Sequence, residues 1–343
     1  MSTGPNLSIR PRLTPAIASI RSAVRALLPV PAVQNPDARQ RPLVLVALSG
    51  GADSLALAAA TAFEAPRAGI RAGAIIVDHA LQAGSAEIAA RAAEQARDLG
   101  LNPVTVSRVE VGTTGGPEAA AREARYAALA GNAAEHSAVA VLLGHTLDDQ
   151  AETVLLGLAR GSGGRSLQGM AAVSGVYLRP MLGIRRSATL QFCLDSGLDP
   201  WHDPHNDEQQ YRRVRVRTTV LPTLERELGP GIAEALARTA AQSREDAAAL
   251  DRLAEDQLED LAELCEAGIS LAARALASNP AALRQRIIRM TVAAEFGVNL
   301  SRDQTLEVAR LVTHFSGQRG VDLPGIRVER HGALLTFRST KEP

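Results

Sequence analysis

The sequence predicts an α/β protein: a parallel-stranded sheet flanked by helices, followed by a smaller, mainly helical domain that ends in a short β-hairpin. Three observations support this fold class. Short apolar, valine-rich runs recur at 43–48, 73–77, 103–106 and 138–143, and stretches with helical character follow them at 54–63, 85–99, 117–135 and 147–159. Such alternation indicates βαβ units, because strands buried on both faces are almost continuously apolar. From residue 221 the composition changes to long stretches rich in Ala, Leu, Glu and Arg.

The chain of 343 residues divides into three predicted segments. Residues 1–42 form an N-terminal helical extension and linker, because apolar residues recur at helical spacing over 14–28 and four prolines fall within 29–42. Residues 43–220 form the α/β domain. Residues 221–343 form the helical domain, with hairpin strands expected at 320–328 and 333–337.

The composition of the chain excludes several classes of function and sets conditions on others. The 37 basic and 37 acidic residues balance, so an RNA partner requires a local basic patch. Lys341 is the only lysine, which excludes a Gly-Lys-Ser/Thr phosphate loop and argues against a lysine base or Schiff base. Cys193 and Cys265 form no C-x-x-C pair and suit a reducing compartment. No apolar stretch approaches the roughly 18 residues of a membrane span, so we expect a soluble cytoplasmic protein without membrane contact.

A phosphate loop follows the first strand, where ligands of parallel sheets bind. It reads Ser49-Gly50-Gly51-Ala52-Asp53-Ser54 and opens a helix. Glycine amides turned inward form an anion nest, and the helix N-terminus adds partial positive charge. Ser49 and Ser54 can donate hydroxyl hydrogen bonds, whereas the Asp53 carboxylate suits Mg²⁺. The alternative is a glycine turn in which Asp53 or Ser54 caps the helix.

A second polar block, 144–153, begins where the fourth strand ends. Its His145, Asp148, Asp149 and Glu152 lie within two helical turns, and such crowding of charge is costly without a cation to share. The block therefore indicates an Mg²⁺–ATP role. Part of it has a structural alternative, because Thr146 followed by Asp149 fits a helix N-cap.

Two groups of arginines are candidates for phosphate or RNA contact. Arg122 and Arg125 share a helix face with Glu118 and could reach phosphates at the sheet edge, although a solvated salt bridge would explain them too. The densest basic run is Arg212, Arg213, Arg215 and Arg217. It suits an RNA backbone, and a solvated arginine cluster is the alternative.

The loop at 49–54 resembles the PP-loop of the N-type ATP pyrophosphatases, whose Rossmann-like domain cleaves ATP between its α- and β-phosphates. Further stretches at 117–126, 144–170, 178–182 and 201–207 resemble one family of that superfamily, the tRNA(Ile)-lysidine synthases. The resemblance covers roughly residues 43–225. It departs at 78–82, which reads Asp-His-Ala-Leu-Gln where the family has Asp-His-Gly-Leu-Arg, and at His205, where Ser or Thr is usual. Residues 222–343 resemble the family only loosely.

The resemblance implies an ATP-dependent ligase that forms a carbon–nitrogen bond. The family joins free L-lysine to C2 of the wobble cytidine of the isoleucine tRNA with a CAU anticodon. ATP first adenylates the cytidine O2, pyrophosphate and then AMP leave, and codon reading changes from AUG to AUA. The reacting base leaves the anticodon stack, and with so few aromatic residues we expect arginine planes to hold it.

The resemblance also implies residue roles. The implied ATP-binding residues are Ser49, Gly50, Gly51, Ala52, Asp53, Ser54, Asp78 and His79. Catalytic roles fall to Asp53, Arg122, His145, Asp148 and Asp149, with Mg²⁺ held by Asp53 together with Asp149 or Asp148. The implied tRNA contacts are Arg125, Arg160, Arg165, Arg212, Arg213 and Arg217, with 221–343 as a tRNA-binding domain. The alternatives are a tRNA thiolase of the same superfamily and an inactive RNA-binding protein. A homodimer is left open.

Overall fold

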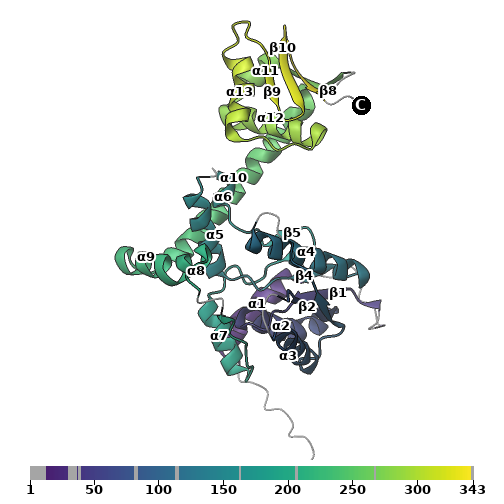
Figure 1. The fold of residues 1–343 in the computed structure, drawn as a ribbon, viewed down its shortest axis with the longest axis vertical. Coiled ribbons are helices and arrows are strands. Elements are labelled where there is room, and N and C mark those ends of the chain that lie inside the picture. Colours follow the sequence, from purple (N-terminus) through teal and green to yellow (C-terminus); the bar gives the residue numbers. More distant parts are fainter. Residues whose placement is uncertain are drawn as a thin grey trace, which may run out of the picture. The chain divides into compact units, whose positions relative to one another are not determined.

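The computed structural model describes residues 13–29, 37, 40–80, 84–112, 116–161, 164–204, 208–265 and 268–340. The chain forms two compact units, Met1–Ala241 and Gln242–Pro343 (Figure 1). The division falls within the long helix α10, Ile232–Leu261. The domain boundary expected near residue 220 therefore lies inside the first unit and stays a prediction about sequence organisation.

The first unit is built on a mostly parallel sheet. Within the described residues its strands, in the spatial order β3-β2-β1-β4-β6-β5, are Val104–Arg108, Arg71–Asp78, Leu43–Ala47, Ala140–Leu142, Tyr177–Leu178 and Val173–Ser174. Only the pair β5–β6 is antiparallel; the other neighbours are parallel. Helices connect β1 to β2, β2 to β3 and β3 to β4, as parallel pairing requires. The predicted fold class is confirmed.

The predicted helices of this unit are also present. They are α1 Pro15–Leu27, α2 Ala52–Glu64, α3 Ser85–Asp98, α4 Pro117–Glu135 and α5 Leu147–Ala159. Further elements follow: the turn η2 Pro66–Ala68, α6 Gly164–Leu167, α7 Arg186–Asp195, α8 Arg212–Arg215, the π-helical turn η4 Val216–Val220, and α9 Leu221–Leu228. The chain passes through all of these elements before it enters α10.

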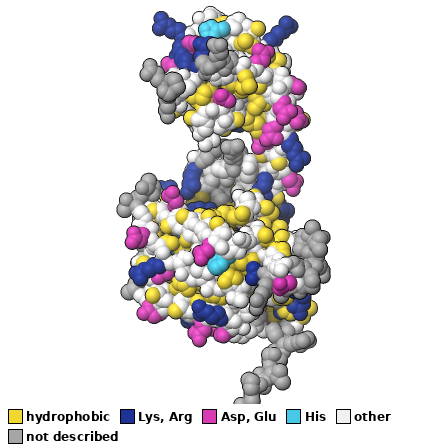
Figure 2. Space-filling view, turned by 90° about the vertical axis from the view of Figure 1, so that its right-hand side faces the viewer, with side chains coloured by type: hydrophobic (Ala, Val, Ile, Leu, Met, Phe, Trp, Pro, Cys, Tyr) yellow, Lys and Arg dark blue, Asp and Glu magenta, His cyan; other side chains and the backbone are white. Residues whose placement is uncertain are grey.

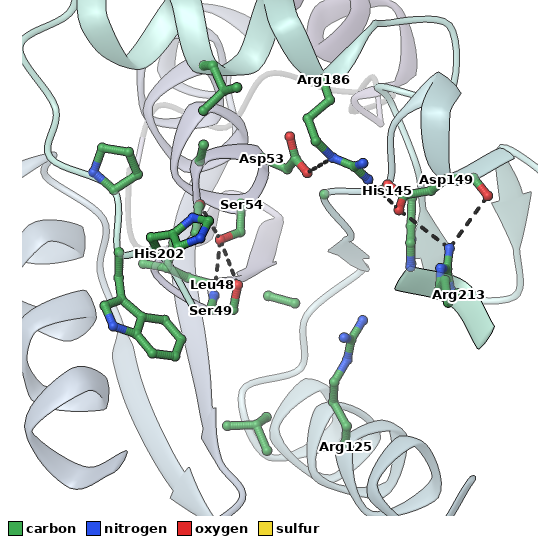
Figure 3. A pocket seen from close by; sticks show the side chains of 18 of the residues that line it. Leu48, Ser49, Asp53, Ser54, Arg125, His145, Asp149, Arg186, His202 and Arg213 are labelled. Carbon is green, nitrogen blue, oxygen red and sulfur yellow. Dashed lines mark hydrogen bonds and ion pairs between the residues drawn. The ribbon is translucent and has the colours of Figure 1, made fainter. Parts of the chain in front are cut away.

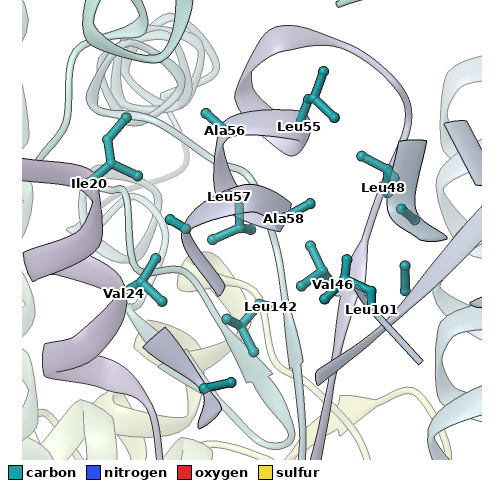
Figure 4. Packing of buried hydrophobic residues seen from close by; sticks show 14 of the residues in the cluster. Ile20, Val24, Val46, Leu48, Leu55, Ala56, Leu57, Ala58, Leu101 and Leu142 are labelled. Carbon is teal, nitrogen blue, oxygen red and sulfur yellow. The ribbon is translucent and has the colours of Figure 1, made fainter. Parts of the chain in front are cut away.

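Both faces of the sheet are covered. Successive side chains of β1 point to opposite sides, so they enter two separate clusters. Val46 packs with Ile20 and Val24 of α1 and Leu57 of α2 in an aliphatic, alanine-rich core (Figure 4). Leu45 faces the other way, into a cluster with Leu129 of α4. With both faces buried, the carboxyl ends of the strands are the edge at which a ligand can approach.

The second unit has more strand than the sequence predicts. Its described strands pair antiparallel in the order β7-β8-β11-β10-β9, and they are Ala262–Cys265, Gly268–Ala272, Leu334–Ser339, Ile326–His331 and Val321–Leu323. Its further helices are α11 Ala273–Ser278, α12 Ala281–Phe296 and α13 Arg302–Thr313. The expected hairpin is present as β10–β11. Residues 262–265 and 268–272 lie in the domain expected to be mainly helical, but they form β7 and β8, because β8 pairs with β11 and buries Leu271.

The surface carries no dominant charge where it is visible. On the face of the first unit shown in Figure 2, basic and acidic side chains are interspersed among apolar and neutral ones. In the described part of the chain, no helix combines the length and apolar character needed to cross a bilayer.

Candidate active site

A cavity of about 710 Å³ opens at the carboxyl edge of the first sheet (Figure 3). Segments distant in sequence contribute to it: the ends of β1 and β2, the starts of α2 and α5, α4, α7, residues 200–202 and the α8–η4 region. Leu48, Ile75, Val77 and Leu129 give it an apolar wall. The rest is polar and charged, so one cavity offers both a surface for a planar ring and groups for phosphates.

The loop at 49–54 is held in shape by its own hydrogen bonds. The Ser49 amide donates to Ser54 Oγ at 3.1 Å, and Ser54 Oγ donates to the Gly51 carbonyl at 3.0 Å. Gly50 has φ +85°, a left-handed conformation that favours glycine. All of the predicted loop residues except Gly50 line the cavity. These hydrogen bonds hold the loop in a defined shape at the cavity.

Gly144 lets the second polar block approach this loop. A Cβ atom on Gly144 would lie 3.1 Å from Ser54 Cα and Ser54 N. That distance is shorter than ordinary van der Waals contact, so a larger residue would push the start of α2 away. The backbone after β4 and the backbone after β1 therefore meet directly at the cavity.

The second polar block caps a helix, as its structural alternative expects, and it also contributes to the cavity wall. Thr146 caps α5, and the Asp149 carboxylate accepts from the Thr146 amide at 2.8 Å. Asp149 also lines the cavity. The capping box fixes the direction in which this carboxylate points.

Arginines pair with the crowded carboxylates of this block. Glu152 is fully buried and accepts from Arg213 Nε and Arg217 Nε, each at 2.7 Å, and from Arg186 Nη1 at 3.3 Å. Asp149 accepts from Arg186 Nη2 at 2.8 Å. Among the described residues no group of three or more His, Cys, Asp or Glu is arranged to hold a metal ion. The crowded carboxylates therefore have guanidinium counter-charges, and the Mg²⁺–ATP role expected for this block stays a prediction.

Arg186 joins this network to the phosphate loop. Its Nε donates to Asp53 at 3.2 Å, and Asp53 also accepts from the Thr189 hydroxyl. Burial raises the pKa of Asp53 above its usual value, although Thr189 and Arg186 act against the rise. Burial would also raise the pKa of Asp149, but Arg186, Arg213 and the bonds from Thr146 outweigh it and leave that pKa low.

Three buried nitrogens at the cavity have no hydrogen-bond partner among the described residues: His79 Nδ1, His145 Nδ1 and Arg125 Nε. All three residues line the cavity. Burial, with a further contribution from Arg125, lowers the pKa of His145 to about 3, so its imidazole is neutral near pH 7. Buried polar groups normally have partners, and these unmatched ones point to a polar ligand.

The other predicted site residues are divided between the cavity wall and positions outside it. Arg122 is exposed beside the Tyr126 ring and is absent from the cavity wall, whereas Arg125 belongs to it. Asp148 lies outside the wall, where it pairs with Arg185 at 3.2 Å. The Asp78 carboxylate also lies outside and accepts the Ala80 amide at 2.9 Å.

The predicted tRNA contacts divide into inward and outward groups. Arg213 and Arg217 line the cavity and bind carboxylates, while Arg160 and Arg212 are exposed. The Arg165 side chain and residues 205–207 lie outside the described residues. The densest basic run is therefore partly an internal counter-charge to Glu152.

Sequence reasoning missed Arg186 and Trp201 as cavity residues. Arg186 begins α7 directly after another arginine, and no short motif marks it. A balance of charges would have been the available signal, because the carboxylates crowded into this block need counter-charges from outside it. Trp201 falls in the stretch 201–207, for which the sequence showed only the family resemblance.

Comparison with known proteins agrees with this geometry. A family model described as a PP-loop domain matches residues 27–224. The tRNA(Ile)-lysidine synthase of Leifsonia xyli subsp. xyli is 60% identical over 323 residues, covering 92% of this chain and 97% of that protein. The tRNA(Ile)-lysidine synthase of Thermobifida fusca is 52% identical over 316 residues, covering 91% and 94%.

A solved structure extends the likeness to the fold. The U34-tRNA thiolase NcsA from Methanococcus maripaludis, with its [4Fe-4S] cluster, superposes with a TM-score of 0.52 and 18% identity. The match covers 66% of this chain and 79% of that one, and at this identity it shows the fold alone. The high identity to curated relatives over nearly the whole of both chains, by contrast, shows that this chain belongs to the tRNA(Ile)-lysidine synthase family.

Proposed function

We propose that the chain ligates free L-lysine to C2 of the wobble cytidine of an isoleucine tRNA with a CAU anticodon, consuming ATP. The cytidine O2 attacks the α-phosphate of ATP, and pyrophosphate leaves. The lysine side-chain amine then attacks C2 and loses a proton, the C2–O2 bond breaks, and AMP leaves carrying O2. The relatives' name supplies the tRNA, and the PP-loop domain supplies the use of ATP.

The observation that carries the proposal is the internally hydrogen-bonded phosphate loop beside an arginine–carboxylate network in one cavity. Backbone amides of 50–54 would stabilise the leaving pyrophosphate, since donors already in place need no reorganisation during the reaction. Arg125, whose buried Nε lacks a partner, is better placed than Arg122 to hold a phosphate oxygen. We therefore transfer to Arg125 the α-phosphate role that the resemblance gave to Arg122.

Magnesium is the expected counter-ion of ATP, and the donor set fits it. Asp53 and Asp149 offer carboxylate oxygens, the ligands that Mg²⁺ prefers, and both already bind one guanidinium, that of Arg186. Bound there, the ion would neutralise charge on the phosphates. Asp148 is the weaker candidate, because it pairs with Arg185 and accepts the Arg186 amide at 2.7 Å.

The lysine substrate must be held by its α-amine and α-carboxylate, so that the side-chain amine is free to attack. The cavity offers both charges close together, in Asp149 and in Arg213 and Arg217. The neutral imidazole of His145 lies beside them and adds no charge to this part of the cavity. This part of the cavity is our proposed lysine site.

The tRNA is expected to contact the exposed arginines, Arg160 and Arg212, outside the cavity. Their role and that of residues 221–343 as a tRNA-binding domain are proposals, as are a homodimer and a cytoplasmic location. Arg125, Arg213 and Arg217 are withdrawn from the proposed tRNA contacts, because they line the cavity.

One assay tests the proposal: protein, Mg²⁺, ATP, radiolabelled lysine and the CAU-anticodon isoleucine tRNA. We expect label in the tRNA with equal release of AMP and pyrophosphate. Asp53→Ala should abolish transfer, whereas Asp98→Ala, exposed at the end of α3, should retain it. Near wild-type transfer by Asp53→Ala would overturn the assigned chemistry.

A thiolase is the alternative within the superfamily. Burial, with Asp53 nearby, raises the pKa of Cys193 to about 12, so this thiol is a poor nucleophile near pH 7. In the same assay, release of AMP and pyrophosphate without lysine transfer would favour sulfur chemistry. Absence of ATP consumption would favour the inactive RNA-binding protein.

A further inference from the structure

Trp201 is the only tryptophan of the chain, and it lines the active-site cavity. It is half-buried, and it lies in a segment to which the proposed chemistry assigns nothing. Aromatic residues are only 3% of the sequence, so a tryptophan at this place has few substitutes. Its neighbour His202 lines the same cavity and is labelled in Figure 3.

The backbone of Trp201 is fixed to the phosphate loop. Its amide donates to the Gly50 carbonyl at 2.9 Å. Two residues earlier, the Asp199 carbonyl accepts from Gln95 Nε2 at 2.8 Å and from Arg91 Nη2 at 3.1 Å, both on α3. The segment 199–201 is thus tied at one end to α3 and at the other to the loop. A ring carried by so constrained a segment loses little conformational freedom when a ligand stacks on it.

Two different surfaces on which a planar ring can lie therefore border the cavity. One is the aliphatic wall of Leu48, Ile75, Val77 and Leu129, contributed by the strand ends and α4. The other is the indole beside the loop. A reaction in which one nucleobase attacks a nucleotide brings two rings to one site, and the cavity has a surface for each.

The position of Trp201 indicates which ring it serves. The adenine of ATP is separated from its own α-phosphate by the ribose, so adenine need not approach the phosphate loop. The attacking base, in contrast, must bring its reacting atom to about 3–3.5 Å from that phosphorus. Trp201 is bonded to the loop itself, at Gly50, and so suits the attacking base.

We propose that the Trp201 indole is the platform on which the reacting nucleobase of the RNA stacks after it leaves the anticodon loop. This inference rests on the proposed function and adds a substrate-binding residue to it. It is an alternative to the expectation that arginine planes hold the base, since Arg186, Arg213 and Arg217 are paired with carboxylates. Stacking on an aromatic side chain is the usual way in which proteins hold unstacked RNA bases.

Because the chain has a single tryptophan, its fluorescence reports on Trp201 alone. We would titrate the full chain with a CAU anticodon stem-loop, with the same stem-loop carrying an abasic wobble position, and with a non-hydrolysable ATP analogue. We expect saturable quenching by the intact stem-loop and little by the other two ligands. Quenching by the ATP analogue alone would assign the indole to adenine, and equal quenching by the abasic RNA would remove the wobble base from it.

Kinetics of Trp201 variants give an independent measurement. Trp201→Leu should raise the KM for tRNA roughly tenfold or more while leaving the KM for ATP within about twofold. Trp201→Phe, which retains a ring, should lose less. Phe63→Leu, the same kind of truncation in α2 away from the cavity, is the matched control for folding. Equal KM values for tRNA in the Leu and Phe variants would overturn the proposal.

Failure of the proposed function would look different. A wild-type chain that transfers no lysine refutes the ligase, whereas the titration with intact and abasic RNA still decides whether the indole contacts the base. The two proposals therefore fail by separate observations.

Discussion

The Arg186 guanidinium contacts the Asp53 carboxylate at 3.2 Å, although the two residues are 133 positions apart in the sequence. The same side chain contacts Asp149 at 2.8 Å and Glu152 at 3.3 Å. One arginine thus links the phosphate loop of α2 to the acidic block of α5. Because these groups are largely buried, removing Arg186 leaves carboxylates without a counter-charge.

Arg186→Gln should destabilise the protein by about 3 kcal/mol, the usual cost of leaving a buried carboxylate unpaired. Urea unfolding followed by circular dichroism measures it. Arg185→Gln is the matched control, because that neighbouring side chain is 38% exposed and its loss should cost under about 1 kcal/mol. Similar losses for the two variants would show that the network contributes no special stability.

Gly144→Ala should weaken ATP binding and lower stability by roughly 1–3 kcal/mol, since its Cβ would lie 3.1 Å from the backbone of Ser54. The KM for ATP and the unfolding midpoint are the measurements. Gly131→Ala on α4, where nothing lies within 4 Å, should be neutral or slightly stabilising. A wild-type KM in Gly144→Ala would mean that the loop tolerates displacement.

Arg125→Gln should raise the KM for ATP at least about tenfold, because a charged hydrogen bond to phosphate is worth roughly 1.5–3 kcal/mol. Arg122→Gln, with its exposed guanidinium beside Tyr126, should change the KM for ATP by under about threefold. Steady-state kinetics with ATP varied at saturating tRNA compares the two. The reverse order would restore Arg122 to the phosphate role.

His145 predicts a pH dependence of stability. Its folded pKa is about 3, whereas its unfolded value is near 6.5, so the unfolded chain binds the proton first as pH falls. The stability associated with the neutral imidazole is present above about pH 6.5 and is lost progressively toward pH 3. In His145→Asn the fall in urea midpoint between pH 7.5 and pH 5 should be smaller than in wild type. An unchanged fall would assign the pH dependence to other groups.

Local signals predicted most of the first unit. The bounds of α4 and α5 agree with the expected 117–135 and 147–159, because the elements begin at Pro117 and at the Thr146 cap. The phosphate loop was recognisable because glycine, serine and a following helix fall within six positions. These features depend on neighbours in the sequence, which a sequence displays directly.

The parts that were missed depend on distant partners. Residues 262–272 have a helix-like composition but form β7 and β8, since pairing with β11 buries Leu271 and joins Ser270 to Thr336 at 3.0 Å. Arg186 has no motif, and its role comes from carboxylates on two other helices. Trp201 is held at the cavity by the hydrogen bond from its amide to the Gly50 carbonyl, 151 positions earlier in the chain. No local pattern contains these relationships.

The fully buried Glu152 limits how far the chain can be truncated from its C-terminal side. Its counter-charges come from residues 186, 213 and 217, long after the phosphate loop and the acidic block have ended. A truncated fragment that stops near residue 200 would keep every recognisable nucleotide-binding motif and still bury a carboxylate with two of its three arginines missing. The smallest autonomous ATP-binding fragment must therefore extend through Arg217, well beyond the last strand of its sheet.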